Sequence, residues 1–207
     1  NDAVFKPGTP SEARRAGIAM VFQHFSLFEA LSVAENISLG MDNPPNRSDL
    51  DGKIKSVSES YGLSLDPAKT VGELSVGERQ RVEIIRCLLQ NPKLLIMDEP
   101  TSVLTPQEVD ILFKTLLKLR SEGTSILYIS HKLEEIRKLC DTATILRLGK
   151  KVDTCTPKNT STKKLAEMMV GSSISTPEKL NKPAGRILLE VDNVCSLSGS
   201  QFGTSLT

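Results

Sequence analysis

Two adjacent carboxylates, Asp98 and Glu99, directly follow the apolar run Leu94–Met97 and precede a proline. A short apolar run of this length is typical of a buried strand. Side chains at neighbouring strand positions point to opposite faces, so the two acids cannot play the same part. Paired acids that a buried strand delivers to one edge indicate a metal-and-water site. Such a site needs a cradle for the phosphate on which it acts.

Upstream of the acids, Ser75-Val76-Gly77-Glu78 matches the capping box S-x-x-E, which predicts a helix starting at Ser75. The first backbone N–H groups of a helix have no partners within the helix, and the helix dipole favours anions there. Gly77 has no side chain, so a phosphate group could approach it closely. The same four residues also fit an ordinary capping box that binds no ligand. The motif alone therefore does not distinguish a phosphate-binding helix start from a simple helix cap.

The elements around these residues predict an α/β fold with a parallel sheet, whose strands are apolar on both faces, covered by helices. Residues 24–72 are polar, loop-rich and intermittently helical, as in an inserted subdomain. A second capping box, Thr105 to Glu108, predicts another helix start, with a proline at its first position. Strands are predicted at 17–23, 93–97, 125–130 and 142–148, with 149–151 as a turn, and further helices at 132–139 and 163–170.

The composition excludes several classes of protein. The 207 residues carry 26 basic and 25 acidic side chains, so no overall field attracts nucleic acid or an acidic membrane. No apolar run is long enough to span a bilayer, and the first residues lack the profile of a secretory signal. The cysteines are far apart and form no CxxC pair, which favours buried thiols in a reducing cytosol: Cys87, Cys140, Cys155 and Cys195.

Five segments in this order resemble the ATP-binding subunit of ABC transporters, a P-loop NTPase family. "VFQ" at 21–23 is similar to the Q-loop of that family, and "LSVGERQ" at 74–80 is similar to its signature motif. "LLIMDEP" at 94–100 resembles the Walker B strand, and "TSVLTPQE" at 101–108 stands where the D-loop belongs. His131 matches the switch histidine. The resemblance covers roughly residues 15–150.

The resemblance implies a role for each residue of these motifs. Asp98 would hold Mg²⁺ through water, together with Gln23, and Glu99 would polarise the attacking water as a general base. His131 would hydrogen-bond the γ-phosphate of ATP and position Glu99, although an isolated histidine is more often structural. Gln23 would sense the metal and the water, whereas a lone glutamine at a strand end is usually solvated. Four residues would cap the γ-phosphate held by an opposing subunit: Ser75, Val76, Gly77 and Glu78.

The segments around "VFQHFSLFEALSVAENISLG" resemble the importer branch that handles sugars and nucleosides and carries two ATP-binding halves on one polypeptide. The partners implied are a second ATP-binding half, transmembrane permease subunits and, indirectly, a periplasmic or lipoprotein substrate-binding protein. The location implied is peripheral, on the cytoplasmic side of the inner membrane. The expected organisation is a partial ATP-binding domain at 1–171 (helical subdomain about 24–82, core about 83–150), a linker at 172–185 and the start of a second domain at 186–207.

The chain departs from the family pattern in two places. Thr105 stands in the D-loop where aspartate is common, which leaves open whether this half is catalytically active. The cradle G-x-x-x-x-G-K-[ST] is absent, because Gly149-Lys150 and Gly52-Lys53 lack both the upstream glycine and the following hydroxyl residue. Family members place that loop upstream of the Q-loop. We therefore expect that the chain starts after the cradle, that alone it neither binds ATP tightly nor hydrolyses it, and that exposed apolar surface makes it self-associate.

The sequence leaves two other functions open. One is a soluble ABC ATPase acting on ribosomes or DNA, which would be expected to carry a basic arm or a zinc-binding insertion between Q-loop and signature. The 50 residues between Gln23 and Leu74 show neither. The other is a non-catalytic interaction module. The charged runs of the helices at 106–120 and 132–138 are interpreted as solvated faces with i,i+4 pairs.

Overall fold

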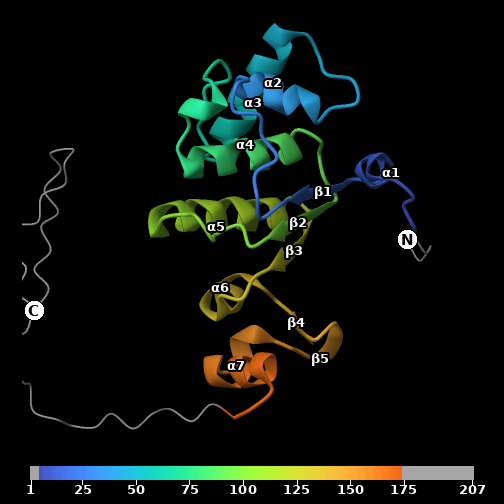
Figure 1. The fold of residues 1–207 in the computed structure, drawn as a ribbon, viewed down its shortest axis with the longest axis vertical. Coiled ribbons are helices and arrows are strands. Elements are labelled where there is room, and N and C mark those ends of the chain that lie inside the picture. Colours follow the sequence, from blue (N-terminus) through green and yellow to red (C-terminus); the bar gives the residue numbers. More distant parts are fainter. Residues whose placement is uncertain (1–4, 174–207) are drawn as a thin grey trace, which may run out of the picture. The chain divides into compact units, whose positions relative to one another are not determined.

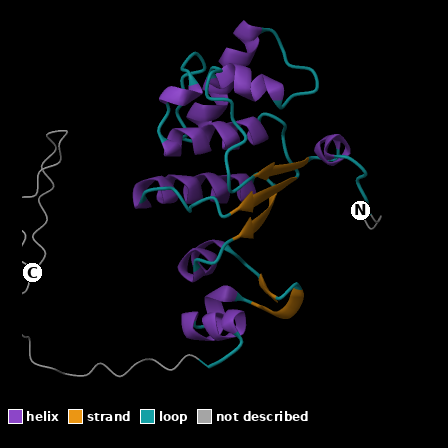
Figure 2. Ribbon diagram, viewed as in Figure 1, coloured by secondary structure: helices purple, strands orange, loops and turns teal. Residues whose placement is uncertain are grey.

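A three-stranded parallel sheet forms the centre of the computed structural model, which describes residues 5–173. Its strands lie in the order β1-β2-β3 (Figures 1 and 2). Met20 is in register with Ile96, and Ile96 with Leu127, so all three strands run in the same direction. The strands are β1 Ile18–Val21, β2 Leu94–Asp98 and β3 Ser125–Ile129. The predicted parallel sheet is thereby confirmed.

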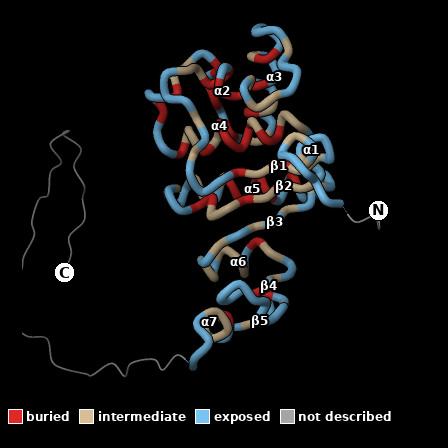
Figure 3. Tube along the Cα trace, turned by 45° about the vertical axis from the view of Figure 1, so that its right-hand side comes forward, coloured by how far each residue is buried: buried red, intermediate tan, exposed pale blue. Residues whose placement is uncertain are grey.

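The sheet is not covered equally on its two faces. Leu95 and Met97 of β2 are fully buried, as a strand between two others requires. On β3, by contrast, Leu127 is 51% exposed and Ile129 is 43% exposed. Figure 3 shows more of the exposed colour along β3 than along β2. The face of β3 that carries these two side chains is therefore covered less than β2 at the centre of the sheet.

Each α-helix that precedes β2 begins at a side-chain cap. Ser75 caps α4 and forms the predicted box with Glu78, and Ser32 and Glu35 form a further box on α2. Thr9 caps α1 by accepting from Glu12 N, but the Glu12 side chain accepts from Gly8 N, whereas Thr105 and Glu108 form a full capping box on a later helix. The elements are α1 Pro10–Arg15, α2 Val33–Leu39, α3 Arg47–Ser60, the short 3-10 helix η1 Val71–Glu73, and α4 Val76–Leu88.

The elements after β2 follow the predicted order, with one difference at the fourth strand. β4 does not join the parallel sheet; it pairs antiparallel with β5, which the sequence had shown only as part of a turn. The turn is formed by Leu148 and Gly149, both with positive φ, so Lys150 already begins the returning strand. The elements are α5 Pro106–Ser121, α6 Leu133–Leu139, β4 Ala143–Arg147, β5 Lys150–Cys155, η2 Pro157–Asn159 and α7 Thr162–Val170.

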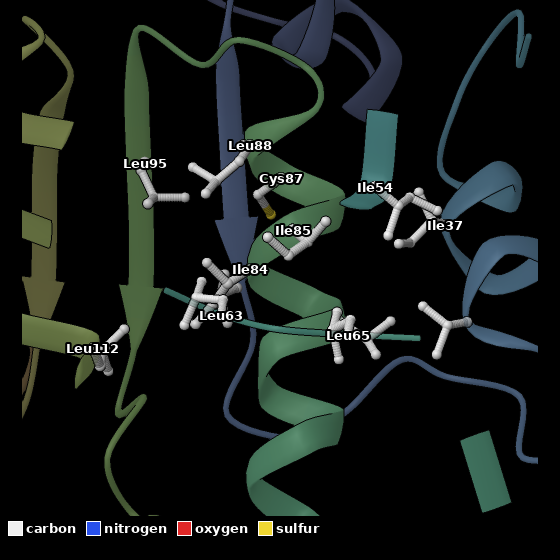
Figure 4. Packing of buried hydrophobic residues seen from close by; sticks show 14 of the residues in the cluster. Ile37, Ile54, Leu63, Leu65, Ile84, Ile85, Cys87, Leu88, Leu95 and Leu112 are labelled. Atoms are coloured by element: carbon white, nitrogen blue, oxygen red, sulfur yellow. The ribbon is translucent and has the colours of Figure 1, made fainter. Parts of the chain in front are cut away.

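Helix α4 lies at the centre of the hydrophobic core. Figure 4 shows Ile84 and Leu88 facing Leu95 of β2, whereas Ile85 faces Ile37 and Ile54 of α2 and α3. A helix that packs on more than one side has apolar residues around most of its circumference. The expected boundary between residues 82 and 83 falls inside this helix, so its two halves belong to one core.

The thiols agree with a core of this kind. Cys87, Cys140 and Cys155 are free, and burial raises the pKa of Cys87 to about 12. Cys195, the expected linker beyond Ser173 and the expected strand at 186–207 lie outside the described residues. Within residues 5–173, the helices are all too short or too polar to cross a membrane.

Candidate functional site

Two side chains from separate segments meet at Glu99. The Nδ1 atom of His131 lies 2.8 Å from Glu99 Oε1, and Gln23 Nε2 donates to Glu99 Oε2 at 3.4 Å. The side chain of Glu99 is partly buried, and that of His131 is largely exposed. A carboxylate held at both oxygens, beside open solvent, is suited to orienting and deprotonating a water molecule.

The parallel sheet explains why these residues meet. Gln23 follows β1, Asp98 ends β2 and His131 follows β3, and the carboxyl ends of parallel strands lie at the same edge. Open α/β sheets bind ligands in the crevice outside that edge. Glu99 leaves the strand with φ 46°, a left-handed conformation that is costly for a residue with a side chain, and its N–H donates to Ile129 O at 2.9 Å. We call Gln23, Asp98, Glu99 and His131 the carboxylate cluster.

The carboxylate cluster suits a magnesium ion only in combination with a substrate. Among the described residues, no group of three or more acidic, histidine or cysteine side chains could hold a metal ion. Mg²⁺ is usually bound by one or two carboxylates together with waters and phosphate oxygens. Asp98 and the amide oxygen of Gln23 would supply the protein part of that set. Their chemistry fits an ion that arrives with a nucleotide.

The predicted signature residues form a second group, which the structure does not bring to Glu99. Ser75 Oγ accepts from Glu78 N at 3.3 Å, and Glu78 accepts from Ser75 N at 2.8 Å and from Lys69 Nζ at 3.2 Å. The bond from the Ser75 backbone is the main cause of a lowered pKa of Glu78. A lowered carboxyl pKa contributes stability above the ordinary pKa, which is lost as the pH falls through the lowered value. Val76, which directly follows Ser75, is exposed.

Gly77 packs against helix α5, which gives a second reason for a glycine there, while the approach of a phosphate stays a prediction. A Cβ atom at Gly77 would overlap the carboxylate of Glu108. That carboxylate accepts from Thr105 N at 2.9 Å and lies 3.9 Å from Arg81, which is on α4. The space beside Gly77 is therefore occupied by the Glu108 carboxylate, so any side chain at position 77 would have to displace that carboxylate.

We predict that Gly77→Ala and Glu108→Ala are strongly non-additive. A methyl group at position 77 displaces the Glu108 carboxylate and with it the α5 cap, which is worth about 1 kcal/mol. Once the carboxylate is displaced, its removal costs little, so the double-mutant cycle gives a coupling of about 1 kcal/mol. Urea unfolding of the four proteins measures this coupling.

The matched control for this cycle is Gly52→Ala. Gly52 lies within α3 and has open space around its Cα, so alanine raises the free energy of unfolding by about 1 kcal/mol through helix propensity alone. Additive effects of Gly77→Ala and Glu108→Ala would refute the contact between the two residues.

Two acidic residues near the site were not identified from the sequence. Glu83 is fully buried and accepts from Ser26 N at 2.9 Å, close to Gln23. Glu135 accepts from Thr101 Oγ1 at 2.7 Å, so the interpretation of residues 132–138 as a solvated face is wrong at this position. The only sequence signal for Glu83 was a charge within an otherwise apolar helix stripe. Glu135 had none, because its partners are distant in sequence.

Comparison with known proteins places these residues in a family context. Residues 2–102 match the family model of the ABC transporter domain. The nucleoside import ATP-binding protein NupA of Lactococcus lactis subsp. cremoris is 42% identical over 192 residues, which are 90% of this chain and 38% of that protein. The glucose import ATP-binding protein TsgD13 of Haloferax volcanii is 39% identical, over 90% of this chain and 40% of its own length. The chain thus spans about two fifths of these relatives.

Solved structures show the same fold. A crystal structure of the ADP conformation of an ATP-binding cassette from an ABC transporter aligns with a TM-score of 0.66 and 27% identity, over 79% of this chain and 72% of that one. A nucleotide-free ATP-binding cassette aligns with a TM-score of 0.65 and 25% identity, over 78% of this chain and 68% of its own.

Proposed function

Because this chain belongs to the ATP-binding family of ABC transporters and has its P-loop NTPase fold, we propose that it is part of an energy-coupling subunit of an importer. Its relatives carry the names of nucleoside, glucose, galactose and ribose import proteins. The solute proposed is a nucleoside or a simple sugar. The convergence of Gln23 and His131 on Glu99 is the observation that carries the proposal.

In the proposed reaction, Glu99 takes a proton from the water that attacks the γ-phosphate of ATP. His131 and Gln23 each contact one carboxylate oxygen of Glu99, which fixes the orientation of the carboxylate toward the water. Bound Mg²⁺ would neutralise charge on the phosphate oxygens, and Asp98 and Gln23 would hold it. The signature residues Ser75–Glu78 would offer the N-terminus of α4 to the nucleotide of an opposing ATP-binding half.

The residues present do not supply a full ATP site. The 207 residues contain no G-x-x-x-x-G-K-[ST] loop for the β- and γ-phosphates, and positioning of those phosphates is the main requirement of phosphoryl transfer. The exposed β3 side chains Leu127 and Ile129 support the idea that further structure normally covers this sheet. The chain is therefore proposed to act as one part of a larger ATPase, and its self-association stays a prediction.

We predict that the isolated chain shows no magnesium-dependent phosphate release, whereas a chimera does. In the chimera, this chain replaces the aligned 192 residues of the Lactococcus lactis relative, which keeps its remaining sequence. Coupled-phosphate-release assays measure both proteins with ATP and with or without Mg²⁺. Robust turnover by the isolated chain would refute its dependence on a separate cradle.

Uptake by cells tests the importer function itself. The chimera is expected to restore uptake of labelled nucleoside to a strain that lacks the relative, because permease subunits of that strain would accept it. A chimera that hydrolyses ATP but restores no uptake would contradict the proposed partners. These partners are a second ATP-binding half, the permease and, through it, a substrate-binding protein, with the chain peripheral on the cytoplasmic side of the membrane.

A further inference from the structure

A second, more buried network of hydrogen bonds lies next to the carboxylate cluster and is centred on Glu135. Its Oε2 atom accepts from Thr101 Oγ1 at 2.7 Å and from Tyr128 OH at 2.8 Å. Its Oε1 atom lies 3.4 Å from Lys132 Nζ, which also donates to the backbone oxygen of Thr101 at 2.8 Å. These four residues, the Glu135 network, join the turn after β2, the strand β3 and the helix α6.

The Glu135 carboxylate at the centre of the network is largely buried, whereas the Lys132 side chain is 40% exposed. Thr101 is 1% exposed and the side chain of Glu135 is 13% exposed. Burial is the main cause of a raised pKa of Tyr128, and the hydrogen bond to Glu135 adds to it. The phenol therefore stays protonated and donates a hydrogen bond to the Glu135 carboxylate. Hydrogen bonds to a charged acceptor in such surroundings are stronger than average, and the loss of one partner leaves another unsatisfied.

The network is attached to the chain next to both Glu99 and His131. Thr101 is two residues after Glu99, and Lys132 directly follows His131. The network therefore holds the chain on both sides of the 2.8 Å contact between His131 and Glu99. His131 itself is largely exposed and has no other described hydrogen bond that fixes its ring. A small shift of α6 would carry His131 away from Glu99.

We propose that Glu135 is a positioning residue that sets the contact between His131 and Glu99. Its catalytic consequence rests on the proposed function, but the contact itself can be tested without hydrolysis. Reacting groups lose efficiency steeply when displaced by about 1 Å, so a residue that holds both of their segments matters even though it touches no substrate. Glu135 would thus act on Glu99 through Thr101 and on His131 through Lys132.

The test is an NMR measurement on the chain with isotope-labelled histidine. The chain has only two histidines, so the Cε1–Hε1 signals of His131 and His24 are readily distinguished by one His131→Gln spectrum. Glu99→Gln is expected to move the His131 signal and defines the effect of an altered contact. Glu135→Gln is expected to move the His131 signal in the same direction while the His24 signal stays in place.

The matched control is Glu134→Gln. It makes the same chemical change one residue earlier on α6, but the Glu134 side chain is 76% exposed and pairs with Arg137 at 3.7 Å. This variant is expected to leave the His131 signal unchanged. A general loss of stability does not move one histidine signal of the folded chain selectively, so the readout separates positioning from a structural role.

A second pair of variants covers the case that Glu135→Gln does not fold. Thr101→Val removes the hydroxyl donor at nearly equal volume and is expected to move the His131 signal, whereas Thr101→Ser keeps the donor and is expected to restore it. An unmoved His131 signal in both Glu135→Gln and Thr101→Val, with a moved signal in Glu99→Gln, overturns the positioning role alone. An unmoved signal in Glu99→Gln overturns the contact, and with it both this inference and the proposed part of His131.

Discussion

Replacement of Glu99 by glutamine is expected to lower the rate of ATP hydrolysis by the chimera about 100- to 10,000-fold, the usual contribution of a general base. Glutamine keeps the shape of the side chain and can still accept from Gln23, but it cannot take a proton from water. The expected loss is in kcat, with the KM for ATP little changed, because a general base acts in the transition state. Steady-state phosphate release over a range of ATP concentrations measures both constants.

The control for this variant is Glu134→Gln, which removes an exposed carboxylate near the same histidine. It is expected to keep the parent rate. A Glu99→Gln chimera that retains more than about a tenth of the parent kcat would show that Glu99 is not the general base, since even a weak base contributes more than that.

Replacement of Glu83 by alanine is expected to lower the free energy of unfolding of the chain by about 3–5 kcal/mol, the usual cost of breaking a buried ion pair. Glu83 is fully buried, forms an ion pair with Arg86 and accepts from Ser26 N at 2.9 Å. Arg86 in turn donates to Ser26 O at 3.1 Å. The substitution therefore leaves a half-buried cation and a backbone donor without their partner.

Urea unfolding measures this loss, with Asp51→Ala as the matched control. Asp51 pairs with Arg47 at 2.9 Å on the surface of α3, and its removal is expected to cost less than about 1 kcal/mol. The double variant Glu83→Met with Arg86→Met is expected to recover part of the loss, because no buried charge is left unpaired. A loss of stability below about 1 kcal/mol for Glu83→Ala would show that Glu83 and Arg86 do not form their hydrogen bonds with the Ser26 backbone.

The local part of the fold could be predicted because its signals lie within a few residues. Ser75 with Glu78 and Thr105 with Glu108 marked two helix starts, and the structure has both caps. The same signals at Thr9 and Ser32 were available and were not used. The strand β5 gave no such signal, because its residues are mostly exposed and show no apolar alternation.

The distant contacts could not be predicted in the same way. Motif order indicated that Gln23, Glu99 and His131 belong to one site, and the parallel sheet brings them together. Nothing in the spacing of Glu135 shows that it bonds to Thr101, which lies 34 residues earlier in the chain. The antiparallel partner of β4 was equally hidden, since an apolar run does not show in which sheet it will lie.

The position of α4 limits how this protein can be divided. Its side chains fill the space against the sheet and the space against α2 and α3, so both layers share a single core (Figure 4). A cut between residues 82 and 83 would yield two pieces, neither of which can close its own interior. Recombination among relatives can therefore exchange the residues of this core only together. Because of helix α4, the helical layer and the sheet must be exchanged together.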